Sequence, residues 1–429
     1  MDRRTMGQLI TPAIPEPFRI FVGWDSREDF LYQVCRHSLY KRTSGPITVN
    51  PLRQNELREN GIYSREVDAL ASTEFTFTRF LVPHLAGYEG WALFCDCDFL
   101  WQDDIIKLAQ LADDRYAVMC VHHDHHPAEE KKMDGRLQTQ YTRKNWSSMV
   151  LYNCGHPANA VLSPELVNSE SGLFLHRFAW LDDALIGVIP ETWNWLEGWS
   201  TSPGSGSPSA IHFTRGGPWF DDWKHVEYAE LWQAEYESWQ TSGGEEVFKV
   251  FDFWFEECMQ EDRFGGDAKF DAMLRKRFLN AHTRANKGEF VSWRATPQGR
   301  LSEIVILDQF SRNMFRGVPK AFASDTLALK LAKEALAVGA DKMVPQEQRL
   351  FFYLPLEHSE NADDQDLSVK LFASLDNERA RKAAVAHREV FSRFGRFPAR
   401  NNALGRETTK EEEEFLVRPD TPLWSRPRT

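Results

Sequence analysis

Two aspartates, Asp96 and Asp98, stand one residue apart where an apolar run over residues 91–95 comes to an end. A run of this kind is typical of a strand buried on both faces. Alternation along an extended chain would turn both carboxylates to one side and Cys97 to the other. Paired carboxylates suit Mg²⁺ or Mn²⁺, and such a cation can neutralise a diphosphate leaving group. The spacing alone favours a solvated turn just as strongly.

Other side chains in the first half of the chain could complete a nucleotide site around this pair. Asp25 follows a predicted strand, so it would either contact a nucleoside or cap the next helix. Arg79 lies in a helix predicted to end at or before Pro83, and it would bind a phosphate or a carboxylate, or form a surface salt bridge. His212 lies in a later predicted strand, either as a third metal ligand or as a core histidine.

The elements that would position these residues indicate an α/β domain. Strands are predicted over residues 18–25, 47–49, 91–95 and 116–121, within the stretch 143–154, and over 210–220 with a Gly-rich exit. A helix over 26–40 follows the first strand, and this opening is typical of nucleotide-binding domains, whose ligands lie beyond the carboxyl ends of the strands. Asp182 and Asp183 begin a further helix, where their charges would also suit the helix dipole.

The character of the sequence changes at residues 241–245, where Ser242, Gly243 and Gly244 form the best candidate for a linker. From residue 246 onward helical periodicity replaces the strand-like runs, which predicts an all-helical domain of antiparallel helix pairs. The prediction is therefore a tail over 1–17, an α/β domain over 18–240, a linker over 241–245 and a helical domain over 246–429.

Polar clusters stand at the predicted helix ends of the second half. They are dense in Arg, Asn and His for residues that only support packing. One interpretation is a set of hydrogen bonds between helices, and the other is an anion-binding pocket. The candidate pocket residues are Asp308, Arg312, Asn313, His358, His387, Arg396 and Arg400.

Composition narrows the class of protein. The chain has 429 residues, 42% hydrophobic and 13% aromatic, which predicts folded domains. A net charge of −12 argues against nucleic acid as the main partner. The six cysteines form no Cys-X-X-Cys pair, so we expect buried free thiols in a reducing compartment. With no signal peptide and no apolar stretch of about 20 residues, we expect a cytoplasmic protein, with peripheral membrane contact left open.

The first domain, over residues 18–235, resembles the family 8 glycosyltransferases. The run from Phe94 to Asp98 is similar to their Asp-X-Asp strand, and the segment from Ile211 to Phe213 with Pro218-Trp219 is similar to their closing motif. The resemblance implies a GT-A fold, a UDP-sugar donor, Mn²⁺ and retention at the anomeric carbon. It also implies roles for residues at the metal (Asp96, Asp98 and His212), near the nucleotide (Asp25, Arg79 and Asn153) and at the donor sugar (Asp182).

This chain departs from the family pattern in two places. The family's Asp-Gln pair is Asp182-Asp183 here, which bears on the identity of the donor sugar. The family's Lys before the final Pro-Trp is absent, and Gly217 stands in its place. Our hypothesis is that Arg215 substitutes for this lysine in binding the diphosphate.

The second domain, over about 246–420, resembles a bacterial family known as domain of unknown function 924. The matching stretches run over residues 307–313, 356–360 and 393–406. One departure is Ala399, where the family usually has a His after the Pro. The resemblance implies a tetratricopeptide-like helical fold and no established activity.

The sequence thus predicts a metal-dependent glycosyltransferase that moves a sugar from a UDP-sugar to an unknown glycan, lipid or protein acceptor. Asp182 and Asp183 are the candidates for a catalytic role, either orienting the sugar or acting covalently. One alternative is a GT-A-like binding protein with a decayed site. Another places the main activity in the anion-binding pocket of the helical domain. A third gives the helical domain a scaffold role that brings the transferase to its acceptor.

Overall fold

The structure is a computed structural model that describes residues 15–66, 73–123, 143, 145–201 and 207–425. The predicted tail lies almost wholly outside these residues. The chain divides into two compact units, Met1–Trp239 and Gln240–Thr429, which we call the α/β unit and the helical unit.

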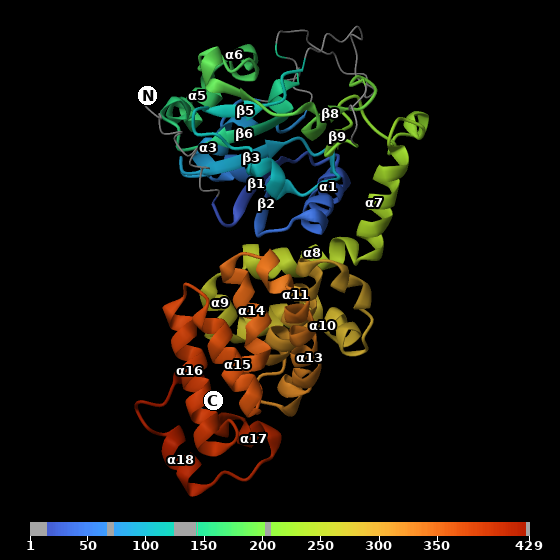
Figure 1. The fold of residues 1–429 in the computed structure, drawn as a ribbon. Coiled ribbons are helices and arrows are strands. Elements are labelled where there is room, and N and C mark those ends of the chain that lie inside the picture. Colours follow the sequence, from blue (N-terminus) through green and yellow to red (C-terminus); the bar gives the residue numbers. More distant parts are fainter. Residues whose placement is uncertain (1–14, 67–72, 124–142, 144, 202–206, 426–429) are drawn as a thin grey trace, which may run out of the picture. The chain divides into compact units, whose positions relative to one another are not determined.

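A mixed six-stranded sheet in the order β2-β1-β3-β6-β5-β7 forms the centre of the α/β unit (Figure 1). Its strands are β1 (Phe18–Gly23), β2 (Ile47–Leu52), β3 (Trp91–Cys95), β5 (Val118–Cys120), β6 (Met149–Asn153) and β7 (Ile186–Val188). β2, β1 and β3 are parallel, whereas β6 runs antiparallel to both β3 and β5. Every residue of β3 is buried, as expected for a central strand.

A second, three-stranded sheet has the order β4-β9-β8. Its strands are β4 (Phe99–Trp101), β8 (Trp195–Leu196) and β9 (Ala210–His212). β4 begins directly after the Asp96-Cys97-Asp98 turn and pairs antiparallel with β9. This small sheet therefore brings the chain around residue 212 beside the end of β3.

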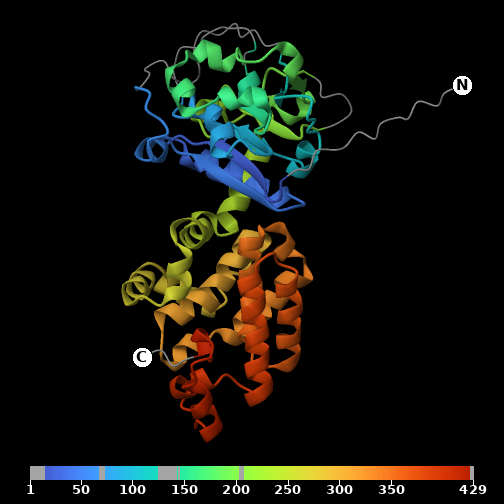
Figure 2. The ribbon, with the colours of Figure 1, turned by 90° about the vertical axis from the view of Figure 1, so that its left-hand side faces the viewer.

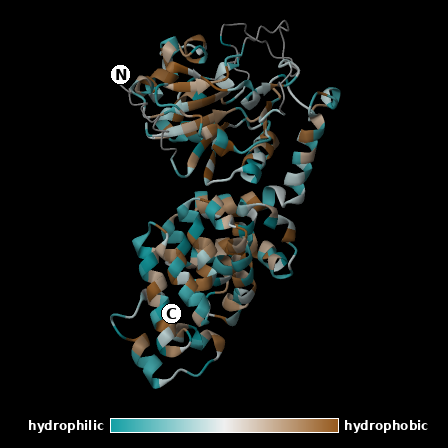
Figure 3. Cartoon of the chain, in the orientation of Figure 1, coloured by the Kyte–Doolittle hydropathy of each residue, from teal (hydrophilic) through white to brown (hydrophobic). Residues whose placement is uncertain are grey.

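Short helices surround the two sheets. They are α1 (Asp29–Arg42), α2 (Gln54–Glu59), α3 (Val82–Leu85), α4 (Ile105–Ala109), α5 (Pro164–Ser169), α6 (Gly172–His176) and α7 (Ala229–Thr241). The prediction that a helix ends at or before Pro83 is wrong. A 3₁₀ turn, η1 (Thr78–Leu81), precedes Pro83, which lies in the first turn of α3, where a missing N–H costs little. Hydrophobic residues follow the strands of this unit (Figure 3).

The described part of the helical unit contains helices and no strand. The helices are α8 (Gly244–Asp252), α9 (Gln260–Gly265), α10 (Ala268–Asn286), α11 (Pro297–Val305), α12 (Ser311–Met314), α13 (Asp325–Ala337), α14 (Gln346–Glu357), α15 (Ala362–Ala373), α16 (Glu378–Phe394), α17 (Asn401–Leu404) and α18 (Lys410–Leu416). Helices α14, α15 and α16 pack against one another in sequence (Figure 2). A π-helical turn, η9 (Ile306–Phe310), joins α11 to α12.

The predicted fold class, an α/β part followed by an all-helical part, is confirmed. All six cysteines are buried free thiols, as predicted. Among the described residues, no helix is both long enough and apolar enough to span a bilayer.

Candidate functional site

Asp96, Asp98 and His212 converge where β3 ends. Each offers one ligand atom, and these three atoms lie within 4.8 Å of one another. Both aspartates are half-buried, whereas Cys97 between them is buried. The alternation expected of an extended chain therefore holds through this turn. We call these three residues the triad.

The register of the small sheet explains how a residue so distant in sequence reaches the aspartates. Phe99 of β4 lies opposite His212 of β9. The two rings stack with their centroids 4.4 Å apart, and the imidazole is 1% exposed. Nε2 of His212 lies 3.3 Å from Oδ1 of Asp98.

Asn194 holds the ring of His212 from its other side. Its Oδ1 lies 2.9 Å from Nδ1 of His212, and its Nδ2 donates to the hydroxyl of Ser148. That hydroxyl donates in turn to the carbonyl of Asn145, so it can only accept from the amide. The chain of donors therefore places a proton on Nδ1 of His212, and in the neutral ring the lone pair of Nε2 faces Asp98.

This donor set fits a divalent cation. A lone pair on Nε2 and a carboxylate oxygen 3.3 Å away are both acceptors, and positive charge between or beside them stabilises the pair. Two carboxylates and one imidazole match the ligand preferences of Mn²⁺, while two oxygens alone would suit Mg²⁺.

Arg79 contacts the triad directly. Its NH1 lies 2.9 Å from Oδ1 of Asp96 and also donates to the carbonyl of Ser147. Arg79 is 6% exposed, and its guanidinium lies over the rings of Phe75 and Phe94. The alternative of a surface salt bridge is therefore wrong. The structure places this fixed cation beside one carboxylate of the candidate metal site.

Asp25 lies in the loop after β1, and its carboxylate is fully buried. It accepts hydrogen bonds from the backbone and guanidinium of Arg27 and from the backbone N–H of Glu74. Burial opposes ionisation, but these bonds outweigh it and hold the pKa of Asp25 below its ordinary value. Its carboxylate thus organises the loop, and a nucleoside contact by Asp25 stays a prediction.

Arg215 follows β9 and pairs with the buried Glu197, with NH2 3.1 Å from Oε2. Its guanidinium lies over Trp199 and Trp223, which leaves the side chain 22% exposed. It is close to the triad in sequence, but part of its charge is already neutralised.

An aromatic ring covers Gly217, which stands where the family has its lysine. A Cβ added to Gly217 would lie 2.3 Å from the ring of Trp219. The aromatic ring therefore occupies the space that a side chain at position 217 would need.

Asp182 and Asp183 lie before β7, at the 3₁₀ turn η4 (Asp183–Leu185). Both are exposed, and Asp182 makes no capping hydrogen bond. Asp183 pairs with Arg143, whose NH1 donates to the carbonyl of Arg177. Their expected roles at the donor sugar stay predictions.

The structure places Asn153 away from the triad. β6 runs antiparallel to β3, so Met149 lies opposite Cys95 and Asn153 lies opposite Trp91. Four residues along a strand correspond to about 13 Å. The residues of this segment that reach the triad's surroundings are instead Ser147 and Ser148, at its beginning.

Five of the seven predicted pocket residues of the helical unit converge. We call them, together with Glu357, the polar centre: Asp308, Arg312, Glu357, His358, His387 and Arg400.

Asp308 is the anchor of the polar centre. It lies in η9 and is 1% exposed. Its Oδ1 lies 2.8 Å from Nδ1 of His358 and 3.1 Å from NH1 of Arg312, and its Oδ2 accepts from Gln309. Although burial opposes ionisation, Arg312 and His358 hold the pKa of Asp308 well below its ordinary value.

Two further carboxylates, Asp325 and Glu357, lie beside the arginines and His387 of the polar centre. Asp325 binds Arg312 with both oxygens, at 2.8 and 3.1 Å, and lies 3.5 Å from NH1 of Arg400. Oε1 of Glu357 lies 3.3 Å from Nδ1 of His387. Burial, together with the charge of Asp308, raises the pKa of Glu357 to about 8.

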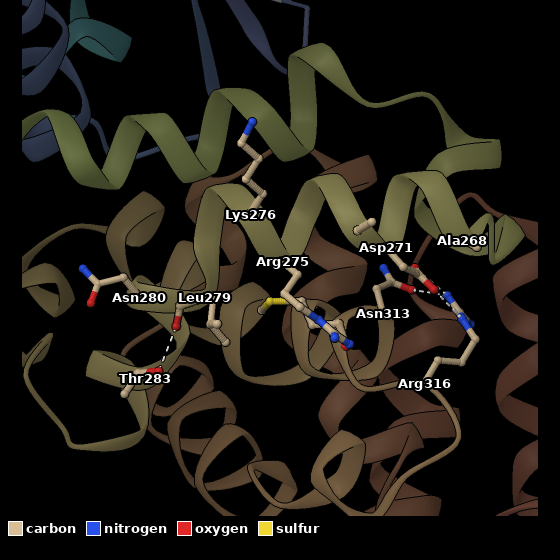
Figure 4. Close-up of a pocket in the computed structure, with 11 residues that line it drawn as sticks. Ala268, Asp271, Arg275, Lys276, Leu279, Asn280, Thr283, Asn313 and Arg316 are labelled. Atoms are coloured by element: carbon tan, nitrogen blue, oxygen red, sulfur yellow. Dashed lines mark hydrogen bonds and ion pairs between the residues drawn. The ribbon is translucent and has the colours of Figure 1, made fainter.

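Two predicted pocket residues lie elsewhere, which corrects the prediction. Arg396 binds Glu412 through Nε and Nη2, at 2.7 and 2.8 Å. Asn313 lines a separate open groove of about 950 Å³ beside α10, where it accepts from Arg316 (Figure 4). Asn313 differs from Arg312 because neighbouring residues on a helix point in different directions, whereas Arg396 lies beyond the end of α16.

Sequence reasoning missed Asn194, Asp325 and Glu357. Asn194 lies between β8 and the 3₁₀ turn η5 (Glu191–Trp193), in a segment without a recognisable motif. Glu357 did stand next to His358 in a matching stretch, and that adjacency was the available signal.

Comparisons with known proteins give separate results for the two parts. Residues 250–420 match the family described as bacterial protein of unknown function (DUF924), as predicted. A protein of unknown function from Agrobacterium tumefaciens, ATU0120, is 37% identical, covering 40% of this chain and 96% of that protein, with a TM-score of 0.39. The galactosyltransferase LgtC, solved with donor and acceptor sugar analogs, is 10% identical, covering 52% of this chain and 96% of that one, with a TM-score of 0.35.

A plant protein is similar over more of the chain than the Agrobacterium protein is. Protein CDI of Arabidopsis thaliana is 57% identical over 235 residues, which are 54% of this chain and 91% of the plant protein. At that identity and coverage, the chain belongs to the family of Protein CDI.

Proposed function

We propose that the α/β unit is a metal-dependent glycosyltransferase that takes its sugar from a UDP-sugar donor. The observation that carries the proposal is the convergence of Asp96, Asp98 and His212 within 4.8 Å at the end of a buried strand. Ligands of α/β sheets bind in this position, beyond the carboxyl ends of strands. The choice of UDP and of retention follows the resemblance to family 8 glycosyltransferases.

In this proposal the triad holds Mn²⁺ or Mg²⁺, which supplies the positive charge that stabilises a diphosphate leaving group. Asn194 keeps Nε2 of His212 directed at the site. Arg79 orients Asp96 and adds a fixed positive charge beside it.

The remaining roles concern the donor and the acceptor. Asp182 and Asp183 are the carboxylates available to orient the donor sugar, and Arg215 could add a contact to the diphosphate. The acceptor hydroxyl would attack from the face that the leaving group departs from. The acceptor is a glycan, a lipid or a protein.

Calorimetry of UDP binding to the full chain, with and without MnCl₂, tests this proposal. We expect binding with Mn²⁺, and a loss of more than about a hundredfold in Asp98→Asn, because removing a direct ligand exceeds the usual effect of removing its supporting partner. Asp103→Asn is the matched control, since Asp103 pairs with Lys107 at the surface.

Absent UDP binding, or binding that does not depend on Mn²⁺, would contradict the proposal. Metal-dependent binding without UDP release from any donor in a screen of UDP-sugars would instead favour the decayed binding protein.

A further inference from the structure

We propose that the polar centre of the helical unit is a binding site for a small oxyanion, the phosphate or carboxylate group of a small molecule, held between Arg312 and Arg400. This site is independent of the proposed transferase function. It lies in the other compact unit, and its residues play no part in the triad.

Arg400 has donors to spare. A guanidinium carries five N–H donors in one plane. In the described structure, Arg400 donates one hydrogen bond, from NH2 to the carbonyl of His358 at 2.8 Å, and pairs with Asp325 at 3.5 Å. The rings of Phe322 and Phe397 lie against it, 5.1 and 4.7 Å from its central carbon, and they offer no conventional acceptor. The edge of the guanidinium is therefore suited to an anion with two oxygens.

Arg312 and Arg400 also repel each other. Burial and the charge of Arg312 together lower the pKa of Arg400 to about 10. Asp325 contacts both guanidiniums, but it binds Arg312 with two short bonds and Arg400 with one long contact. An anion beside Arg400 would relieve this imbalance.

The exposure of the side chains separates a solvent side from an interior. Arg312, Arg400 and His358 are 17, 13 and 15% exposed, whereas His387 and Glu357 are 8 and 5% exposed. The two arginines and His358 are thus the groups that a ligand from solvent meets first. In the interior, Oε2 of Glu357 has no hydrogen-bond partner among the described residues.

His358 adds a titratable group to the site. Asp308 binds its Nδ1, so Nε2 is the ring atom that remains for a ligand. Burial and Arg312 lower the pKa of His358, and Asp308 opposes that shift. The charged and titratable groups that face this ring are Asp308, Arg312, Glu357, His387 and Arg400.

The charges of Asp308 and Asp325 already balance those of Arg312 and Arg400. A bound anion therefore adds a negative charge that a proton on His358 would neutralise. We expect anion binding to be coupled to proton uptake and to tighten as the pH falls.

The backbone supports a functional interpretation of this centre. Asp308 lies in the π-helical turn η9, within a helix that continues from α11 into α12. Turns of this type occur mostly as single insertions in α-helices and are frequent at functional sites.

Calorimetric titration of the full chain with inorganic phosphate, and separately with acetate, tests the inference. We expect saturable binding of one anion, and the anion that binds identifies the ligand class. Arg400→Gln should weaken that binding at least about tenfold, and Arg400→Lys, which keeps the charge but loses the planar fork, should weaken it less.

Arg393→Gln is the control, because Arg393 forms an exposed ion pair with Glu411. Titration in two buffers of different ionisation enthalpy measures the proton uptake. If Arg400→Gln unfolds, the decision rests on Arg400→Lys. The inference is overturned if neither anion binds at millimolar concentration, or if the folded Arg400 variants bind as the unaltered chain does.

Discussion

Each unit holds a histidine by its Nδ1, the buried His212 and the half-buried His358, but the partners differ in charge. In the triad, the partner of His212 is the neutral amide of Asn194. In the polar centre, the partner of His358 is the carboxylate of Asp308. The amide fixes which ring nitrogen of His212 carries the proton and adds no charge, and this arrangement suits a histidine that binds a metal. A carboxylate also stabilises the protonated ring, which suits a group that takes up a proton.

The two sites also differ in how they are neutralised. In the triad, Arg79 contacts one of the two aspartates, Asp96, and both aspartates remain half-buried. The polar centre matches two arginines with Asp308 and Asp325. The first arrangement therefore favours a cation. The second is balanced, so it accepts an anion together with a proton.

Of the substitutions that test this comparison, Asp308→Asn should have the largest effect, which is a loss in the free energy of unfolding. Removing one partner of a buried charge cluster leaves the other charges uncompensated, which costs about 3 kcal/mol. Asp308 has a pKa below its unfolded value of 3.8, so its contribution is present above that pH and is lost as the pH falls below it.

Urea unfolding at neutral pH, followed by circular dichroism, measures this effect. Asp376→Asn, at an exposed position, is the control. An unchanged unfolding midpoint in Asp308→Asn would remove the claim that this carboxylate anchors the polar centre.

The next largest effect is expected on the Mn²⁺ affinity of Asn194→Ala. Without its amide, His212 loses the bond that assigns its tautomer, and we expect Mn²⁺ to bind about tenfold to a hundredfold more weakly. Calorimetry with MnCl₂ alone gives the affinity. Asn168→Ala removes an amide that bonds to Ile62 and Ser64 instead, and it should bind Mn²⁺ normally. Equal affinities in the two variants would show that Asn194 has no role at the triad.

A smaller, pH-dependent effect is expected for Glu357→Gln. Its pKa is about 8 in the folded chain and 4.5 in the reference state, so the folded state holds a proton that the unfolded state has lost between these values. Glu357 therefore lowers stability increasingly as the pH rises from about 4.5 to 8.

Glutamine does not titrate, so Glu357→Gln should raise the free energy of unfolding by more than about 1 kcal/mol near pH 8. Thermal unfolding at about pH 5 and about pH 8 compares the variant with the unaltered chain. A gain that is the same at both pH values would argue against a protonated Glu357.

The smallest effect is expected for Arg215→Ala. Because Glu197 already neutralises this arginine, we expect UDP to bind only about threefold more weakly in the presence of Mn²⁺. Arg115→Ala, at an exposed pair with Asp113, is the control. An unchanged affinity would end the hypothesis that Arg215 replaces the missing lysine.

The sequence was sufficient for the fold class, because strand-like runs and helical periodicity separate cleanly along the chain. It also identified the triad, since alternation puts both aspartates on one side. It failed for Asn153, because a strand's direction is set by its neighbours and not by its own residues. Asn194 was missed because a buried amide in an irregular segment has no pattern, and η9 because a π turn depends on packing around it.

The ring of Trp219 restricts how the closing loop could change over time. It contacts the rings of Phe30, Phe213 and Trp232 as well as covering Gly217. A lysine at position 217 would have to displace this ring and with it several neighbours. A side chain at position 217 is therefore compatible with Trp219 only if this ring takes another orientation, and the neighbouring aromatic rings would have to shift with it.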